Sequence, residues 1–169
     1  LPALVVNPTF MIGPYDSRPS SGALILALYK GKVPGYTNGG KNYVAVKDVA
    51  FAMANAIDRG RIGECYIVGN VNLSFKEAFD LIATTIGAKP PKLKLPNPIV
   101  KLYGSFTSTT AKLFGFNPSV TRELATISCD RHYYSVEKAR KELELPQTPI
   151  ETAVKECFEW FKENGYLKN

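Results

Sequence analysis

Residues 4–22 read LVVNPTFMIGPYDSRPSSG, and this stretch decides the fold. It opens with a short apolar run, residues 4–6, of the kind that forms a buried strand. The run passes directly into the turn-forming pairs Asn7-Pro8 and Gly13-Pro14, and then into a polar loop. We therefore expect a core strand whose carboxyl end leads into a loop. A core strand at this place needs partner strands, and those must come from elsewhere in the sequence.

Downstream, strand and helix patterns alternate. Helices are predicted over residues 20–32, 49–60 and 74–87, with strands over 42–48 and 65–69 between them. The expected N-caps are Ser20 or Ser21 for the first helix, Asp48 for the second, and Ser74 with Glu77 as a capping box for the third. Alternation of this kind predicts an α/β fold, although three short strands make a poor sheet by themselves.

From residue 88 the pattern changes to proline-rich extended chain and then to helices. Helices are predicted over residues 99–118, 119–128, 135–145 and 148–165. Ser135 is the expected cap of the third of these, and Thr148 with Glu151 the expected capping box of the last. No repeat or long linker divides the chain.

The composition argues against a secreted, a membrane-spanning and a nucleic-acid-binding protein. The chain has 169 residues, 45% of them hydrophobic, and a net charge of +6. It has no signal-peptide pattern and no apolar run long enough for a membrane span, so a cytoplasmic protein without a membrane partner is expected. The basic residues form no run of a nucleic-acid module, which argues against nucleic-acid binding. The three cysteines have neither metal-ligand nor disulfide spacing and are expected to be reduced and mostly buried.

Three ordered segments carry a family resemblance: VVNPTFMIGPYDSRPSSG, NYVAVKDVAFAMANAI and GRIGECYIVGNVNLSFKEAFDLIATTIG. Together they resemble the second half of an extended short-chain dehydrogenase/reductase of the NAD-dependent epimerase/dehydratase family, nearest its dihydroflavonol-reductase-like members. The resemblance implies the C-terminal part of a Rossmann-type NAD(P)-binding fold over residues 1–87. It also implies a mostly helical substrate lobe over residues 88–169, with neither part an independent domain.

The resemblance also implies where a cofactor binds. The first strand would end at the nicotinamide side of a cleft for NAD or NADP, with one wall formed by Pro8, Thr9, Phe10 and Met11, and Ser20 would approach from the following loop. Ligands of open α/β sheets sit beyond the carboxyl ends of the strands, which agrees with this placement. Taken alone, the Asn-Pro and Gly-Pro pairs are also explained as ordinary turn formers.

The family's catalytic Ser/Thr, its Tyr-x-x-x-Lys pair and its Gly-rich phosphate loop have no counterpart in this sequence, so no catalytic or metal-binding residue is assigned. Two pairs do have the catalytic spacing, Tyr43 with Lys47 and Tyr134 with Lys138. The first falls on a predicted strand, where four residues span about 13 Å. In the second, the tyrosine precedes the helix that Ser135 is expected to cap. Neither pair is expected to act as a catalytic dyad.

The resemblance implies that the parent protein is an NAD(P)-dependent oxidoreductase or epimerase, which moves a hydride between the nicotinamide and a small carbonyl or alcohol substrate, and that the chain alone is inactive. Lys41-Asn42 stands where nucleotide-sugar epimerases carry Arg-Asp, which disfavours a nucleotide-sugar substrate. His132 is read as a partly exposed structural residue, with a substrate contact or a proton donor as the alternatives. Expected partners are the missing N-terminal half and a second copy of the chain. The alternative is a non-catalytic binding or interaction module.

Overall fold

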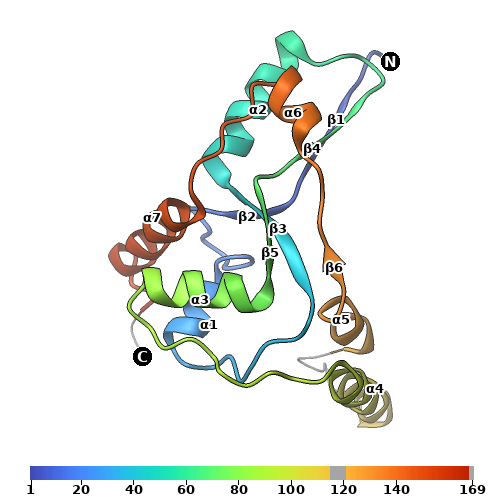
Figure 1. Ribbon diagram of the computed structural model, residues 1–169, viewed down its shortest axis with the longest axis vertical. Helices are drawn as coiled ribbons and strands as arrows, with labels where there is room; N and C mark the ends of the chain where they lie inside the picture. The colour runs from blue at the N-terminus through green and yellow to red at the C-terminus, as the bar shows by residue number, and fades with distance from the viewer. Residues whose placement is uncertain (115–120, 168–169) are drawn as a thin grey trace.

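The computed structural model describes residues 1–114 and 121–167, with the side chains of 112–114 left aside, and these residues form a mixed α/β structure (Figure 1). Strand β1 (Val5–Pro8) pairs in parallel with β4 (Cys65–Val68). A second sheet places β3 (Gly40–Ala45) between β2 (Phe10–Ile12), which is parallel to it, and the antiparallel β5 (Val71–Ser74). The short β6 (Arg131–His132) adds in parallel to the start of β3. The predicted α/β class is confirmed.

Seven helices are described: α1 (Ala23–Tyr29), α2 (Val46–Arg59), α3 (Phe75–Thr85), α4 (Asn97–Phe114), α5 (Arg122–Ile127), α6 (Glu137–Glu142) and α7 (Ile150–Glu163). Figure 1 shows α2 and α6 beside the β1–β4 pair, α1, α3 and α7 grouped on the second sheet, and α4 with α5 set apart at one end. Among the described residues, no helix combines the length and apolarity needed to cross a bilayer.

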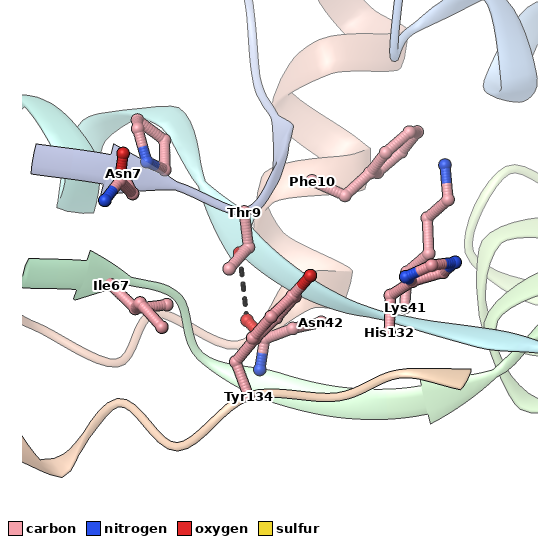
Figure 2. A pocket seen from close by; sticks show the side chains of 9 residues that line it. Asn7, Thr9, Phe10, Lys41, Asn42, Ile67, His132 and Tyr134 are labelled. Carbon is pink, nitrogen blue, oxygen red and sulfur yellow. Dashed lines mark hydrogen bonds between the residues drawn. The ribbon is translucent and has the colours of Figure 1, made fainter. Parts of the chain in front are cut away.

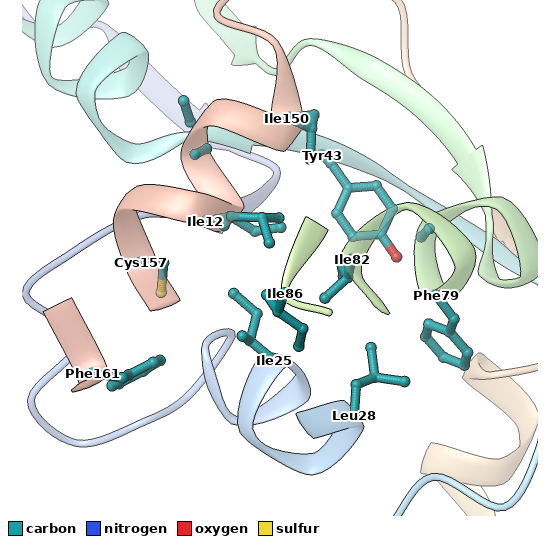
Figure 3. Packing of buried hydrophobic residues seen from close by; sticks show 14 of the residues in the cluster. Ile12, Ile25, Leu28, Tyr43, Phe79, Ile82, Ile86, Ile150, Cys157 and Phe161 are labelled. Carbon is teal, nitrogen blue, oxygen red and sulfur yellow. The ribbon is translucent and has the colours of Figure 1, made fainter. Parts of the chain in front are cut away.

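Two apolar cores meet at β3. Alternation along this strand sends Tyr43 and Ala45 into a core with α1, α3 and α7 (Figure 3), whereas Val44 enters a core with α2, α6 and β4. Ile25 and Leu28 of α1 are fully buried in the first core, as the apolar content of that segment predicted. The C-terminal helices α6 and α7 therefore complete the cores built by the first 87 residues.

Three of the predicted signals at helix ends were confirmed. Ser74 and Glu77 form the reciprocal capping box at the start of α3. Gly60 follows α2 directly, and Gly87 (φ 69°) turns the chain after α3 in the left-handed region that glycine favours.

Four of the predicted caps were wrong. Gly22 rather than Ser20 or Ser21 is the N-cap of α1, and Val136 rather than Ser135 is that of α6. The strand predicted to reach Asp48 ends at Ala45, so Asp48 lies inside the first turn of α2 and is buried. Its carboxylate accepts hydrogen bonds from the Thr148 backbone N–H (2.8 Å) and hydroxyl (2.7 Å).

Because its hydroxyl is bonded to Asp48, Thr148 is not the N-cap of α7, and the capping box predicted for Thr148 and Glu151 does not form. The N-cap of α7 is Pro149, without a side-chain cap, because the Thr148 hydroxyl is directed to Asp48.

The prediction of mostly buried cysteines holds for Cys129 and Cys157 but not for Cys65, which is exposed on β4; all three are free thiols. The helix predicted over residues 99–118 matches α4, and its residues 115–118 lie outside the described residues, as do 119–120 of the next.

Candidate functional site

The site lies where the chain crosses from one sheet to the other. Thr9 is the residue between β1 and β2, and its backbone N–H donates to the Val68 carbonyl at the end of β4 (2.9 Å). The carboxyl ends of the parallel strands β1 and β4 therefore open at the same place. Clefts at such strand ends are the usual ligand sites of α/β sheets.

An open cleft of about 470 Å³ occupies this position (Figure 2). Its walls come from β1, β2, β3, β4 and β6, together with Thr9 between the first two strands and Tyr134 after β6. The lining residues are Asn7, Pro8, Thr9, Phe10, Lys41, Asn42, Ile67, His132 and Tyr134. The lining thus combines the apolar side chains of Pro8, Phe10 and Ile67 with amide, ammonium, imidazole and phenol groups.

A chain of amide hydrogen bonds fixes the floor of the cleft. The Thr9 hydroxyl donates to the Asn42 Oδ1 (2.9 Å), and the Asn42 Nδ2 donates to Asn72 Oδ1 (2.7 Å). Asn72 in turn exchanges two bonds with the backbone of Tyr134, each 3.1 Å long. Because Asn42 is only 1% exposed, this network holds β2, β3, β5 and the segment after β6 in one arrangement.

Gly69 is needed beside this network. A Cβ built there would stand 2.1 Å from the Asn42 Oδ1, far inside van der Waals contact. Only a residue without a side chain allows the chain after β4 to pass this close to the amide. Sequence reasoning did not predict the contacts among Asn42, Gly69 and Asn72, because these residues meet partners that are far away in the sequence.

Lys41 and His132 form the cationic end of the cleft. They are register partners on the parallel strands β3 and β6. The Lys41 ammonium lies 4.6 Å from the centre of the Phe10 ring, and burial lowers the pKa of Lys41 below its ordinary value. The His132 Nε2 is buried without a hydrogen-bond partner in the part of the chain that the structure describes. His132 therefore lines the cleft with a nitrogen that is unpaired among the described residues, and its role as a substrate contact or proton donor stays a prediction.

The structure brings three of the five expected cofactor residues together. Pro8, Thr9 and Phe10 line the cleft. Met11 is 38% exposed and does not line it, since alternation along β2 turns its side chain away from that of Phe10. Ser20 is also outside the lining; its backbone N–H donates to the Asp16 carboxylate (3.0 Å), which closes the loop before α1.

Tyr43 and Lys47 are separated by the boundary between β3 and α2. The Tyr43 side chain is buried in the first core, its hydroxyl has no hydrogen-bond partner among the described residues, and burial raises the pKa of Tyr43 above its ordinary value. Lys47 instead forms an ion pair with Glu156 of α7 (2.6 Å). The Tyr43 hydroxyl and the Lys47 ammonium therefore lie in different surroundings, as expected of two residues that do not form a catalytic dyad.

Tyr134 and Lys138 are likewise engaged separately. Tyr134 lines the cleft, and Figure 2 shows its hydroxyl directed towards the space between Thr9 and Phe10. The Lys138 ammonium donates to Glu64 (2.6 Å) and to the Cys65 carbonyl (2.9 Å). No group of three metal-ligating side chains occurs within residues 1–114 and 121–167.

A second cavity, of about 680 Å³, lies between α3 and the α4–α5 pair. It is mainly apolar; Tyr36, Phe75 and Phe79 lie on one side, and Ile99, Tyr103 and Leu124 on the other. Its only polar side chains among the described lining residues are the hydroxyls of Tyr, Thr and Ser. An apolar ligand part would fit this space.

Comparison with known proteins places this geometry in a family. The chain is 32% identical to a putative dihydroflavonol 4-reductase of Synechocystis sp. over 98% of its own length and 50% of that protein. The chain is a homologue of the dihydroflavonol-reductase-like short-chain dehydrogenases/reductases. It spans about half the length of the curated relatives it matches. No family model matches the sequence.

Solved structures agree with this relationship. The crystal structure of gox2253 matches 99% of this chain and 51% of its own with a TM-score of 0.82 and 37% identity. A UDP-glucuronic acid 4-epimerase from Bacillus cereus, solved with UDP-glucuronic acid and NAD, matches 97% of this chain and 46% of its own (TM-score 0.64, 12% identity) and shares the fold. The fold of this short-chain dehydrogenase/reductase homologue matches the C-terminal part of a Rossmann-like epimerase fold, as the resemblance implied.

Proposed function

We propose that the protein carrying this chain is an NAD(P)-dependent oxidoreductase or epimerase, and that this chain supplies the nicotinamide-side wall of its cleft. The observation that carries the proposal is the position of Pro8, Thr9 and Phe10 in a cleft at the carboxyl ends of the parallel strands β1 and β4. Homology to reductases of this family supports it.

The residues of the cleft fit a nicotinamide. Pro8, Phe10 and Ile67 offer apolar surface for a planar ring, and the exposed Asn7 amide can both donate to and accept from a carboxamide. When bound, the nicotinamide supplies or accepts the hydride. The chain's own contribution is to hold the ring in one orientation, with Asn42 fixing Thr9, and to cover one side of it from water.

The proposed substrate is a small carbonyl or alcohol compound. Lys41 and Asn42 replace the Arg-Asp pair expected for nucleotide sugars, and the buried Asn42 is committed to the amide network rather than to a ligand. Without a Gly-rich phosphate loop in its sequence, the 169-residue chain by itself should not bind the cofactor well. A dissociation constant for NADH or NADPH of about 10 μM or tighter for the isolated chain would contradict this assignment of roles.

The test uses the full-length protein and calorimetry with NADH and NADPH. We expect Thr9→Trp to weaken cofactor binding by about tenfold or more, because the indole would fill the wall against which the ring packs. The matched control is Met53→Trp on α2, where the native side chain is 52% exposed and far from the cleft. Equal affinity in the wild type and Thr9→Trp would place the nicotinamide elsewhere.

A second set of variants tests the catalytic assignment. Tyr43→Phe and Tyr134→Phe should change turnover little, since neither tyrosine has a lysine beside it. Ser20→Trp should weaken turnover if the loop after β2 approaches the cofactor, as the family resemblance implies. Loss of turnover in Tyr134→Phe with full cofactor affinity would instead make Tyr134 a catalytic residue.

A further inference from the structure

The positive charge of the chain is concentrated in one segment. Residues 81–122 carry five lysines and one arginine and no Asp or Glu, and so account for the whole net charge of +6. The remainder of the chain carries fifteen basic and fifteen acidic residues. The structure places the helices of this segment, α4 and the start of α5, at the end of the molecule opposite the β1–β4 pair (Figure 1).

The same segment exposes a continuous apolar stripe. Ile99, Leu102, Tyr103 and Phe106 recur at steps of three and four along α4, which puts them on one helix face. Their exposed fractions are 60%, 71%, 58% and 66%. The opposite face carries Gly104, which packs so closely on α5 that a Cβ would stand 2.4 Å from the Ala125 Cβ. Packing against α5 therefore leaves the large apolar side chains in water.

We infer that α4 is an interfacial helix that lays this apolar stripe on an anionic lipid bilayer. The stripe belongs to a segment with a net charge of +6, and helices that combine an apolar face with basic surroundings lie in the plane of a membrane surface. Tyr103 is the kind of aromatic side chain that favours the depth of the lipid headgroups, and Phe106 is of the kind that such helices insert below them. The expected absence of a membrane partner rested on the lack of a long apolar run, which bears on spanning helices and not on helices that lie on the surface.

The positive charge of the segment favours an anionic bilayer over a second copy of the chain as the partner of the apolar stripe. A second copy would bring two segments of the same strong positive charge together, which opposes association. An anionic bilayer complements that charge, and it also accepts the apolar stripe, which nucleic acid would leave in water. Ile99 and Tyr103 also line the 680 Å³ apolar cavity, so a helix seated on lipid would bring the rim of this cavity to the membrane.

The test is sedimentation of the full-length protein with vesicles of phosphatidylcholine alone and of phosphatidylcholine mixed with phosphatidylglycerol. We expect binding to the anionic vesicles that weakens steeply as salt is added, and little binding to the neutral ones. Phe106→Glu should reduce the partition coefficient by about tenfold or more, because a carboxylate replaces the inserted ring. Lys94→Gln, at an exposed lysine just before α4, should reduce it by about fivefold.

Matched controls lie outside the segment. Ile57 is an isoleucine of α2 that is 84% exposed, so Ile57→Glu places the same charge on another apolar surface, and Lys32→Gln removes one charge from another exposed lysine. Both variants should bind the anionic vesicles like the wild type. Unchanged thermal midpoints would show that the α4 variants remain folded.

Three results would overturn the inference: no binding to anionic vesicles, equal loss in the Ile57→Glu control, or full binding by Phe106→Glu. Light scattering of the lipid-free protein tests the alternative that a second copy of the chain covers the stripe. A dimer that dissociates in Phe106→Glu, without vesicle binding by the wild type, would assign the stripe to a second copy instead. None of these measurements uses the cofactor, so the inference and the proposed function can fail separately.

Discussion

Gly69 offers a sharp test of the amide network, because the damage done by a methyl group there should depend on Asn42. In Gly69→Ala the new Cβ would lie 2.1 Å from the Asn42 Oδ1, so the amide must move by more than 1 Å to restore ordinary contact. That movement breaks the bonds of Asn42 to Thr9, to the Asn70 N–H and to Asn72.

The expected cost follows from these contacts. Three hydrogen bonds at about 1 kcal/mol each give an upper figure of ~3 kcal/mol. The Asn70 N–H keeps a second acceptor, the Tyr43 carbonyl at 2.9 Å, which lowers the loss of hydrogen bonding to about 2 kcal/mol. Overpacking adds about 1 kcal/mol. We therefore expect Gly69→Ala to lower the free energy of unfolding by about 3 kcal/mol, and Asn42→Ala by about 2 kcal/mol.

The double variant decides whether the reasoning is right. In the Asn42→Ala background the atom that the new methyl group meets is gone, and the next contact, the Thr9 Cγ2, is at 3.0 Å. Gly69→Ala should then cost less than about 1 kcal/mol more. Urea unfolding of the four proteins measures the cycle. Costs that add to within about 0.5 kcal/mol would show that the two positions are not coupled and would refute the account.

Three further predictions concern other parts of the molecule. Asp48→Ala should lower the free energy of unfolding by about 2 kcal/mol in urea titrations, since both of its bonds to Thr148 join α2 to α7, whereas Thr148→Val should cost about half as much. Burial raises the pKa of Cys157 to about 11, so Cys65 should react with a thiol reagent at pH 8 while Cys157 does not, and a reactive Cys157 would contradict its burial. The Cys157 thiol ionises at a lower pH in the unfolded chain than in the folded one. The free energy of unfolding should therefore fall as pH rises from about 9 to 11, and Cys157 should have no effect on it below pH 9. The isolated chain should self-associate through residues 3–30 in light scattering, and Leu26→Lys should abolish this; a monomer indifferent to the substitution would show that the surface is covered from within the chain.

The sequence by itself determined the elements whose signals are local. The capping box of Ser74 and Glu77, the stop at Gly60 and the apolar period of α7 all depend on residues within a few turns of one another. The alternation of strands and helices through residue 87 and the family followed from the same local segments, whereas the short strands β2, β5 and β6 were not predicted. Such signals are legible because the interacting groups are fixed by the helix or strand in which they lie.

The tertiary structure alone decided the pairings between distant residues. Asp48 fits a helix cap by local rules, yet its carboxylate binds Thr148, one hundred residues away. Lys41 and His132 share a cleft because the two-residue strand β6 joins β3, a pairing too short to leave a periodic signal. The exposure of the α4 stripe was equally hidden: an amphipathic pattern shows that a helix has an apolar face, but only packing shows whether another element covers it.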